Sequence, residues 1–455
     1  MKIFRRAARL RGTLIAVFAI TTLFPCVMAS TWKERALLGF NNLNGATPTG
    51  ALIFGANGNL YGTTSYGGDL TCAQGIGCGV VFELTATSNG GWKETILYRF
   101  KGGNDGSIPD EYATLIFDDQ GNLYGTTSAG GGSTACDYGG FSGCGTVFEL
   151  TPTSSGPWKE KILYRFNGGN GSLPQGGLVF DQQGNLYGTT SVGGGSQNCG
   201  VGVGCGVVFE VANNGNGTWN GRALHIFNGA PKGCQNCDGD VPLGTLALDI
   251  AGNLYGTSTS GGINNQGTVF ELSPTVASGW KYRTIYSFQG VPDGAEPFAG
   301  VTLDQQGNLY GTTVNGGTGT VCPPDCGTVF ELSPSAGNWT ETTLYNFLGG
   351  ADGAEPLFPL LFDAVGNIYG STTFGGANPN CTINLGPGGC GTAFELTPSA
   401  SGIWTETLLF LFNETDAGPQ NLIFDSQGNL YGTSVFGGRA GCSIGNCGIV
   451  FELFQ

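Results

Sequence analysis

Seven copies of one hexapeptide pattern, G-N-[LI]-Y-G-[TS], occur along this chain of 455 residues. The copies begin at Gly58, Gly121, Gly184, Gly252, Gly307, Gly366 and Gly428. A period this regular indicates one supersecondary unit repeated in tandem. A unit of about 60 residues is too small to bury a core alone, so the units are expected to pack on their neighbours.

One unit, residues 174–227, contains four strand-like segments separated by turns. Residues 177–181 and 186–190 alternate in polarity on either side of a Gly-Asn turn, which predicts a hairpin. The third segment covers residues 206–211, and the fourth begins at Trp219 and ends at Phe227. Four antiparallel strands per unit, in seven units, predict an all-β fold, a seven-bladed β-propeller.

The tryptophans give the strongest signal within the unit. All seven stand in the fourth segment, and each is followed eight residues later by a phenylalanine, from Trp32 and Phe40 to Trp404 and Phe412. Because side chains alternate along a strand, this even spacing predicts that both rings lie on the same face.

The two ends of the chain are complementary. The segment Trp32–Phe40 is a fourth strand without a third, and residues 448–453 are a third strand without a fourth. We expect these segments to pair, which would complete the last blade, close the ring and leave no open sheet edge.

Two sets of motifs resemble known repeats. The pattern P-x-x-x-L-x-F-D-x-x-G-N-L-Y resembles the first hairpin of NHL-type propeller repeats. The whole unit, with G-N-L-Y-G-T-T-x-x-G-G, G-T-V-F-E-L and W-x-E-x-x-L-Y-x-F, resembles the GloVer tandem repeat of secreted "choice-of-anchor" proteins. This resemblance covers nearly all of residues 30–455 and implies an extracytoplasmic repeat protein. No C-terminal sorting segment of the kind common in that family is recognised, so free secretion is expected.

The first 29 residues differ from the rest. Five basic residues precede an apolar stretch from Leu14 to Phe24, and small residues before Ser30 suit signal-peptide cleavage near Ala29. A lipoprotein signal through Cys26 fits less well, because Phe24 and Pro25 suit a lipobox poorly. The predicted organisation is a secretory signal peptide at 1–29 and one propeller at 30–455, without a membrane span in the mature chain.

The mature chain is strongly acidic. Loss of the five basic residues takes the formal net charge from −15 to −20. This charge repels nucleic acid and anionic membranes. The expected location is extracellular or periplasmic, and the expected partner is an unidentified extracellular glycan or protein.

Apart from Cys26, the cysteines form seven close pairs: 72/78, 136/144, 199/205, 234/237, 322/326, 381/390 and 442/447. Local pairing after a signal peptide predicts disulfides: Cys72 with Cys78, Cys136 with Cys144, Cys199 with Cys205, Cys234 with Cys237, Cys322 with Cys326, Cys381 with Cys390 and Cys442 with Cys447. A structural zinc site is disfavoured, because the spacings vary and His225 is the one histidine.

A turn of the form [DN]-G-x-x-P joins each fourth strand to the next unit, with a shortened version from Asp416 to Pro419. It lies at the end of the blade that also carries the paired cysteines. The candidate binding residues are carboxylates at this end: Asp105, Asp238, Asp240, Asp293, Glu296, Asp352, Glu355 and Asp416. They suit a cation, a sugar or a protein partner, or they simply build the turn. No cofactor or metal site is predicted, with a divalent cation such as Ca²⁺ as the alternative.

Other recurrent acids have structural explanations. The aspartate that ends the first strand, for example Asp118, is expected to cap its hairpin. The glutamate of the third strand, for example Glu83, is expected to pair across strands with a residue such as Arg99 or Lys159. His225 replaces a tyrosine of the other units, which predicts packing and not catalysis.

These observations predict a secreted, disulfide-stiffened binding or structural module, with no catalytic residues assigned. The alternative is a propeller enzyme, a carbohydrate-active lyase or hydrolase or a lactonase, with carboxylates at the channel mouth. An active site would require residues that break the repeat and converge. Residues 234–240 are the most irregular part of the chain.

Overall fold

The computed structural model describes residues 32–109, 112, 114–154, 156–199, 204–229, 238–277, 279–319, 321–322, 326–378, 381, 388–438, 440–442 and 445–455. They belong to one compact unit, Thr31–Gln455. The predicted signal peptide and the Cys234/Cys237 pair lie outside the described residues. Within those residues, no helix combines the length and the apolar character needed to cross a membrane.

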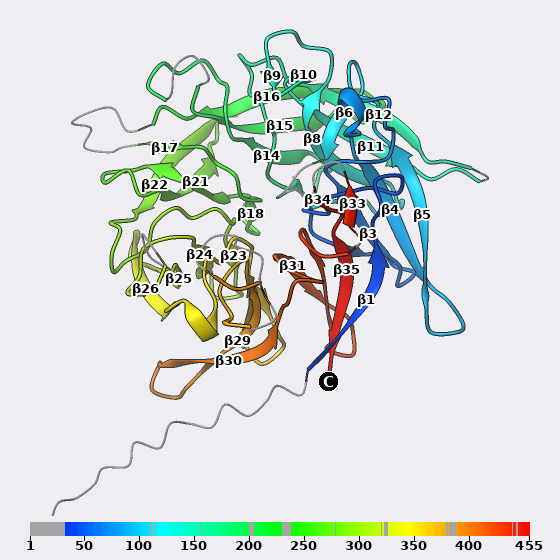
Figure 1. Cartoon of the computed structure of the whole chain (residues 1–455). Coiled ribbons are helices and arrows are strands. Elements are labelled where there is room, and N and C mark those ends of the chain that lie inside the picture. Colours follow the sequence, from blue (N-terminus) through cyan, green and yellow to red (C-terminus); the bar gives the residue numbers. More distant parts are fainter. Residues whose placement is uncertain are drawn as a thin grey trace, which may run out of the picture. The chain divides into compact units, whose positions relative to one another are not determined.

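The described residues form seven blades of antiparallel strands arranged in a ring, which confirms the predicted β-propeller (Figure 1). In blades 1 and 3 to 6 the strands pair in chain order. Blade 2 has the additional strand β6, which pairs with β8 beside β7, and in blade 7 the N-terminal strand β1 pairs with the C-terminal strand β35. The strands of blades 1 to 3 are β2 (Ile53–Phe54), β3 (Leu60–Thr64), β4 (Val80–Ala86) and β5 (Trp92–Arg99); β6 (Gly106–Pro109), β7 (Ile116–Phe117), β8 (Leu123–Gly130), β11 (Thr146–Thr151) and β12 (Lys159–Arg165); and β13 (Val179–Phe180), β14 (Leu186–Thr190), β15 (Val207–Asn213) and β16 (Trp219–Ile226).

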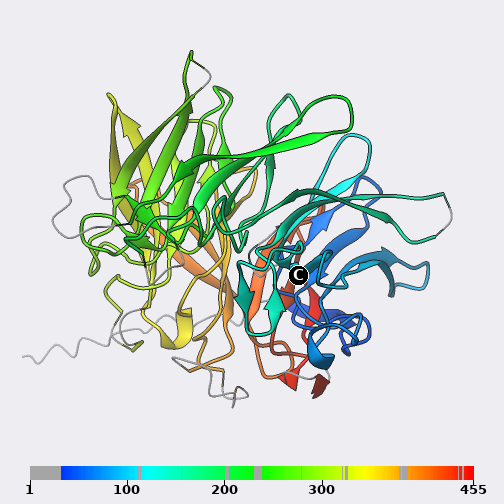
Figure 2. The same ribbon diagram turned by 90° about the horizontal axis from the view of Figure 1, so that it is seen from above.

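Blades 4 to 7 repeat the arrangement, and Figure 2 gives a second view of the blades following one another in chain order. Their strands are β18 (Ala247–Leu248), β19 (Leu254–Ser258), β21 (Thr268–Pro274) and β22 (Trp280–Ser287); β23 (Thr302–Leu303), β24 (Leu309–Thr313), β25 (Thr328–Ser335) and β26 (Asn338–Asn346); β27 (Leu361–Phe362), β28 (Ile368–Thr372), β29 (Thr392–Pro398) and β30 (Trp404–Leu411); and β31 (Pro419–Phe424), β32 (Leu430–Ser434), β35 (Ile449–Phe454) and β1 (Lys33–Gly39).

The loops between blade strands contain short additional elements. They are β9 (Asp137–Tyr138) with β10 (Phe141–Ser142), β17 (Gly239–Asp240) with β20 (Ser260–Gly261), β33 (Ala440–Cys442) with β34 (Gly445–Asn446), and the 3₁₀ helices η1 (Ala73–Gly75) and η2 (Gly350–Asp352).

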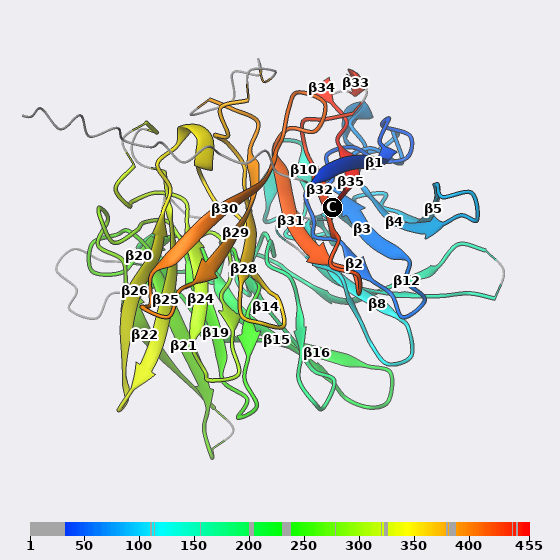
Figure 3. The ribbon, with the colours of Figure 1, turned by 90° about the horizontal axis from the view of Figure 1, so that it is seen from below.

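The ring is closed by the two ends of the described chain. Strand β1 pairs antiparallel with β35, from Lys33 opposite Phe454 to Gly39 opposite Ile449. Figure 3 shows β1 in blue beside β35 in red. The predicted pairing of the N-terminal and C-terminal segments is therefore confirmed, and the last blade takes strands from both ends of the sequence.

The prediction that each tryptophan and its phenylalanine share one face is wrong. In every described blade the pairing of the third and fourth strands contains a β-bulge; in blade 1, Val81 pairs with Tyr98 and Phe82 with Ile96, so Leu97 is skipped. A bulge places two residues opposite one, so the alternation shifts by one residue. Trp92 and Phe100 consequently enter different core clusters.

The phenylalanines face the following blade. Each packs edge-to-face on the third-strand phenylalanine of that blade, with ring centroids 5.0–5.3 Å apart. The seven pairs complete the circle: Phe40–Phe82, Phe100–Phe148, Phe166–Phe209, Phe227–Phe270, Phe288–Phe330, Phe347–Phe394 and Phe412–Phe451. Gly62 in the hexapeptide makes room for this ring, because a Cβ there would lie 2.7 Å from Cζ of Phe82.

The tryptophans face the preceding blade, where they contact the tyrosine of its G-N-L-Y motif. Trp92 lies 6.2 Å from Tyr431 between ring centroids, and Trp219 lies 6.1 Å from Tyr124. Each blade therefore contacts one neighbour through a tryptophan and the other through a phenylalanine.

Ring closure makes Phe40, near the N-terminus, equivalent to an internal residue such as Phe227. Both are fully buried. We predict that Phe40→Ala and Phe227→Ala each lower the free energy of unfolding by about 3–5 kcal/mol, because each leaves a cavity in a blade interface. Urea unfolding of the two variants tests this.

The control is Leu43→Ala, because Leu43 is 64% exposed. It should change stability by less than about 0.5 kcal/mol. If Phe227→Ala lowered the free energy of unfolding by the predicted amount and Phe40→Ala left it unchanged, the result would contradict ring closure.

Candidate functional site

The strand order assigns the loops of each blade to two ends. We call the end with the loops between second and third strands, and with the connections to the next blade, the disulfide-bearing end. The other, the hairpin end, has the turns between first and second and between third and fourth strands. All candidate binding residues predicted from the sequence belong to the disulfide-bearing end.

Six of the seven predicted disulfides are present among the described residues: Cys72–Cys78, Cys136–Cys144, Cys199–Cys205, Cys322–Cys326, Cys381–Cys390 and Cys442–Cys447. They also position contacts between blades. The carbonyl of Cys78 accepts a hydrogen bond of 3.0 Å from the N–H of Ile108, and that of Cys326 accepts one of 3.1 Å from Glu355. In blade 4, Gln266 takes the place of the cysteine and accepts from Glu296 at 2.9 Å.

The residue that donates this hydrogen bond has a left-handed backbone in every described connection. The φ angles are 58° at Thr47, 56° at Ile108, 53° at Leu173, 56° at Val241, 56° at Glu296, 55° at Glu355 and 66° at Gly418. For residues other than glycine this conformation costs about 1–3 kcal/mol, which the surrounding structure must offset. This left-handed position is hard to recognise from the residues alone, because glycine occupies it in one blade only.

The recurrent aspartates build the turns. Each accepts a hydrogen bond from the backbone N–H that follows the fourth-strand phenylalanine: Asp105 from Lys101 at 3.0 Å, Asp238 from Asn228 at 3.0 Å, Asp293 from Gln289 at 2.7 Å, Asp352 from Leu348 at 2.9 Å and Asp416 from Asn413 at 2.6 Å. These carboxylates are spread around the ring, one per interface. Their shared contacts favour the turn-building explanation over a common binding site.

His225 occupies a packing position. Its ring stacks on Tyr282 with centroids 3.9 Å apart, and its Nε2 lies 3.0 Å from Oδ2 of Asp238. In the equivalent place, the Tyr286 hydroxyl donates to Asp293 at 2.6 Å. The histidine therefore replaces a tyrosine that contacts the turn aspartate.

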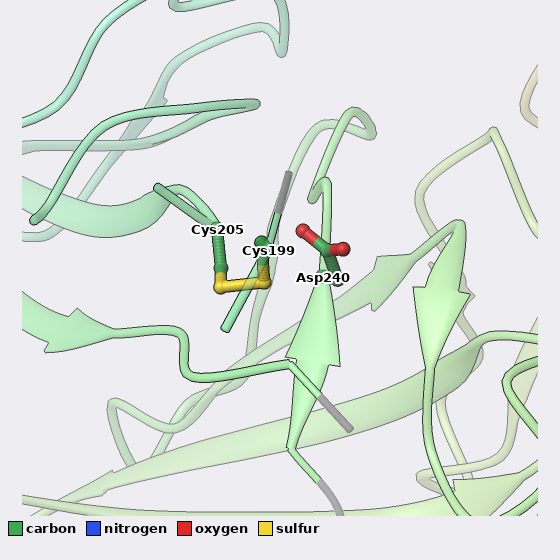
Figure 4. A group of neighbouring side chains, drawn as sticks. All are labelled: Cys199, Cys205 and Asp240. Atoms are coloured by element: carbon green, nitrogen blue, oxygen red, sulfur yellow. A yellow bond between two sulfur atoms is a disulfide. The ribbon is translucent and has the colours of Figure 1, made fainter. Parts of the chain in front are cut away.

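Asp240 lies beside the Cys199–Cys205 disulfide (Figure 4). Burial raises the pKa of its carboxyl to about 6. Its Oδ1 is buried and has no hydrogen-bond partner among the described residues. Because the two sulfurs are bonded to each other, they offer no thiolate to a metal ion.

Glu296 and Glu355 are the candidates that the structure brings together. They occupy the left-handed position in two consecutive connections, where the other blades have Thr47, Ile108, Leu173, Val241 and Gly418. Burial, and then the negative charge of Glu296, raise the pKa of Glu355. The Nδ2 of Asn315 donates to Oε2 of Glu296 at 2.9 Å. Both carboxyls are half-buried.

Described residues from six blades meet around one small cavity. Its volume is about 10 Å³, and its lining includes Ala51, Tyr112, Thr245, Phe298, Phe358 and Asn421. The Tyr112 ring lies 6.1 Å from Phe298 and 6.2 Å from Phe358 between centroids. No carboxyl group occurs among the described residues that line it, so this cavity adds no support for the enzyme alternative.

At the hairpin end, the first-strand aspartates cap their turns. Asp118 Oδ1 accepts from the N–H groups of Gln120 at 2.9 Å and Asn122 at 2.8 Å. The named partners of the third-strand glutamates were wrong, because register places a different fourth-strand residue opposite them. Glu149 pairs with Lys161 at 3.7 Å, not with Lys159, and Glu83 accepts from Asn59 at 2.6 Å and Tyr61 at 2.7 Å, not from Arg99.

A second row of carboxyls lies on the fourth strands and interacts with the turn aspartates of the preceding connection. Burial, and then the charge of Asp352, raise the pKa of Glu406 to about 7. Burial also raises the pKa of Glu160 to about 7, with the charge of Asp105 adding to the effect. Glu94 differs, because it accepts a 2.8 Å hydrogen bond from the neutral Asn44 amide.

These carboxyls make stability depend on pH. The pKa of Glu406 is about 7 in the folded protein, against an ordinary value of 4.5. At a pH between these two values, Glu406 is protonated in the folded protein and ionised in the unfolded chain. The folded state then binds more protons, so its stability falls as the pH rises through this window. We predict a Tm that decreases from pH 5 to pH 8 and a shallower decrease in Glu406→Gln, which cannot ionise.

Circular-dichroism melting curves of the protein, Glu406→Gln and Glu94→Gln across this range provide the measurement. Glu94→Gln is the matched control and should flatten the curve less, because no turn aspartate faces it. A Tm that rises with pH would contradict the assignment.

Comparison with solved structures shows the same fold in proteins of very different sequence. A fungal alcohol oxidase of the AA5 family in complex with copper is 12% identical, with a TM-score of 0.52 over 93% of this chain and 76% of that chain. An ancestral GH74 enzyme is 12% identical, with a TM-score of 0.52 over 90% of this chain and 48% of that chain. A gluconolactonase from Xanthomonas campestris is 12% identical over 73% of this chain and 82% of that chain, and its TM-score of 0.36 is too low to establish a shared fold.

At these identities the likeness shows the fold alone. No match was found among curated proteins. The sequence does match one repeat family, in the region that holds blades 3 to 5. The profile of the Gloeobacter/Verrucomicrobia repeat aligns with residues 134–384, more than half of the chain, and the protein belongs to this family.

Proposed function

We propose that this protein is a secreted binding module that captures an extracellular ligand at the disulfide-bearing end of the ring. Six disulfides fit an extracellular or periplasmic protein, because such bonds persist in oxidising compartments. They also stiffen the loops on which a rigid scaffold usually carries its binding residues.

The observation that carries this proposal is the pair Glu296 and Glu355. All seven described connections share the left-handed geometry, and among them only Glu296 and Glu355 place a carboxyl at this position. A site that departs from the repeat in two adjacent blades is what a single asymmetric ligand requires. The turn aspartates, by contrast, recur in blades that cannot all touch one ligand.

The chemistry of the pair indicates what the ligand must offer. Burial and the neighbouring charge of Glu296 raise the pKa of Glu355, so the pair favours a ligand that brings positive charge or hydrogen-bond donors. Ca²⁺ coordinated by oxygen atoms and a basic segment of a protein partner both meet this requirement. The acidity of the mature chain adds attraction for cationic groups.

We predict that Glu296→Gln and Glu355→Gln each weaken ligand binding about tenfold or more, because each removes one of the two negative charges. Calorimetry and native mass spectrometry with Ca²⁺, and capture on arrays of Lys/Arg-rich peptides and of glycans, provide the measurements. Asp119→Asn is the matched control, since it removes an exposed charge at the hairpin end. Binding that both glutamine variants leave unchanged would refute the proposal.

A further inference from the structure

Clefts between neighbouring blades open at the hairpin end, opposite Glu296 and Glu355. One, of about 340 Å³, lies between blades 2 and 3 and is lined by Asp118, Gln120, Asn122, Tyr124, Phe180 and Trp219. Another, of about 520 Å³, lies between blades 6 and 7 and is lined by Trp32, Asp363, Tyr369, Phe424, Gln427 and Asn429. Both volumes fall in the range typical of small-ligand sites.

The two clefts use the same positions of the repeat. Trp219 corresponds to Trp32, and Tyr124 to Tyr369; Asp118 and Phe180 correspond to Asp363 and Phe424. Two interfaces on different sides of the ring therefore present equivalent side chains to solvent. The cleft is a property of the repeat unit and not of one irregular loop.

A tryptophan forms the apolar wall of each cleft. Trp219 is only half-buried, although its ring packs on Tyr124 with centroids 6.1 Å apart. The polar groups beside it are fixed: the Tyr124 hydroxyl donates to Asp118 at 3.0 Å, and Asn122 Nδ2 donates to Asp118 at 2.7 Å. An aromatic face thus stands next to oriented hydroxyl, amide and carboxylate groups.

We propose that these inter-blade clefts are binding subsites for a neutral glycan, with one sugar ring stacked on each tryptophan. A sugar has an apolar C–H face and a rim of hydroxyls, which matches an aromatic wall flanked by hydrogen-bonding groups. The ligand is neutral because the acidic chain repels uronic acids and other anionic sugars. This site is separate from the one proposed at the disulfide-bearing end.

Repetition adds avidity. The same tryptophan–tyrosine contact joins blade 1 to 7 (Trp92–Tyr431), 2 to 1 (Trp158–Tyr61), 4 to 3 (Trp280–Tyr187) and 5 to 4 (Trp339–Tyr255). A polysaccharide with repeating units can engage several clefts at once, so weak single subsites bind tightly in combination. On this proposal, the repeated clefts hold the protein on a polymeric glycan.

Intrinsic fluorescence reports on these clefts directly, because every tryptophan of the chain occupies the equivalent position. The mature protein is titrated with cellohexaose, xylohexaose and maltohexaose, with polygalacturonate as the anionic comparison. We expect at least one neutral hexasaccharide to protect the tryptophans from acrylamide quenching about twofold or more, and polygalacturonate to give no protection. Absence of protection by all three neutral sugars, or equal protection by polygalacturonate, overturns the proposal.

Variants separate the two sites. Trp219→Ala should remove about one seventh of the binding capacity for the protecting hexasaccharide, because it deletes one of seven equivalent tryptophans. Trp219→Phe, which keeps a smaller aromatic ring against Tyr124, should remove less. Glu355→Gln should leave protection unchanged. Loss of glycan binding in Glu355→Gln, with full capacity in Trp219→Ala, would place the glycan at the other end and refute this inference alone.

Discussion

The β-bulge between the third and fourth strands is the constraint on which the rest of this ring depends. By skipping one residue, such as Leu97, it shifts the alternation of the fourth strand midway. The tryptophan before the bulge then reaches the preceding blade, and the phenylalanine after it reaches the following one. A strand without the bulge would place both rings against one neighbour and leave the other interface without its aromatic contact.

The connections at the disulfide-bearing end add a second link between blades. A cysteine carbonyl of one blade accepts from a left-handed residue at the start of the next, and a turn aspartate accepts from the end of the fourth strand. Most recurrent polar groups at this end are therefore occupied in holding the ring together. Binding is better sought where the repeat is broken, at Glu296 and Glu355, or where it leaves a tryptophan accessible between blades.

The acidic side chains at the blade interfaces are arranged less favourably for stability than the aromatic side chains. Glu160 and Glu406 face the turn aspartates of the preceding connections, and the charge of Asp105 or Asp352 adds to burial in raising the pKa of the glutamate. Three interfaces avoid this. Glu94 accepts from the Asn44 amide in one, and Tyr282 stacks on His225 in the second. In the third, Gly221 leaves room for the Tyr164 ring, which a Cβ would approach within 2.2 Å. The blade interfaces therefore share one backbone arrangement but differ in whether a second acidic side chain faces the turn aspartate.

The sequence by itself determined the repeat, the four strands of each blade, the pairing of residues 33–39 with 449–454 and six of the local cysteine pairs, because all of these follow from spacing along the chain. Tertiary structure alone decided which face each ring occupies, since a bulge is invisible in an even spacing of eight residues. It also decided which side chain lies opposite Glu149, because register selects Lys161 over its near neighbour Lys159. The juxtaposition of Glu296 with Glu355, and the opening of clefts beside Trp219, likewise depend on contacts between blades that no single repeat encodes.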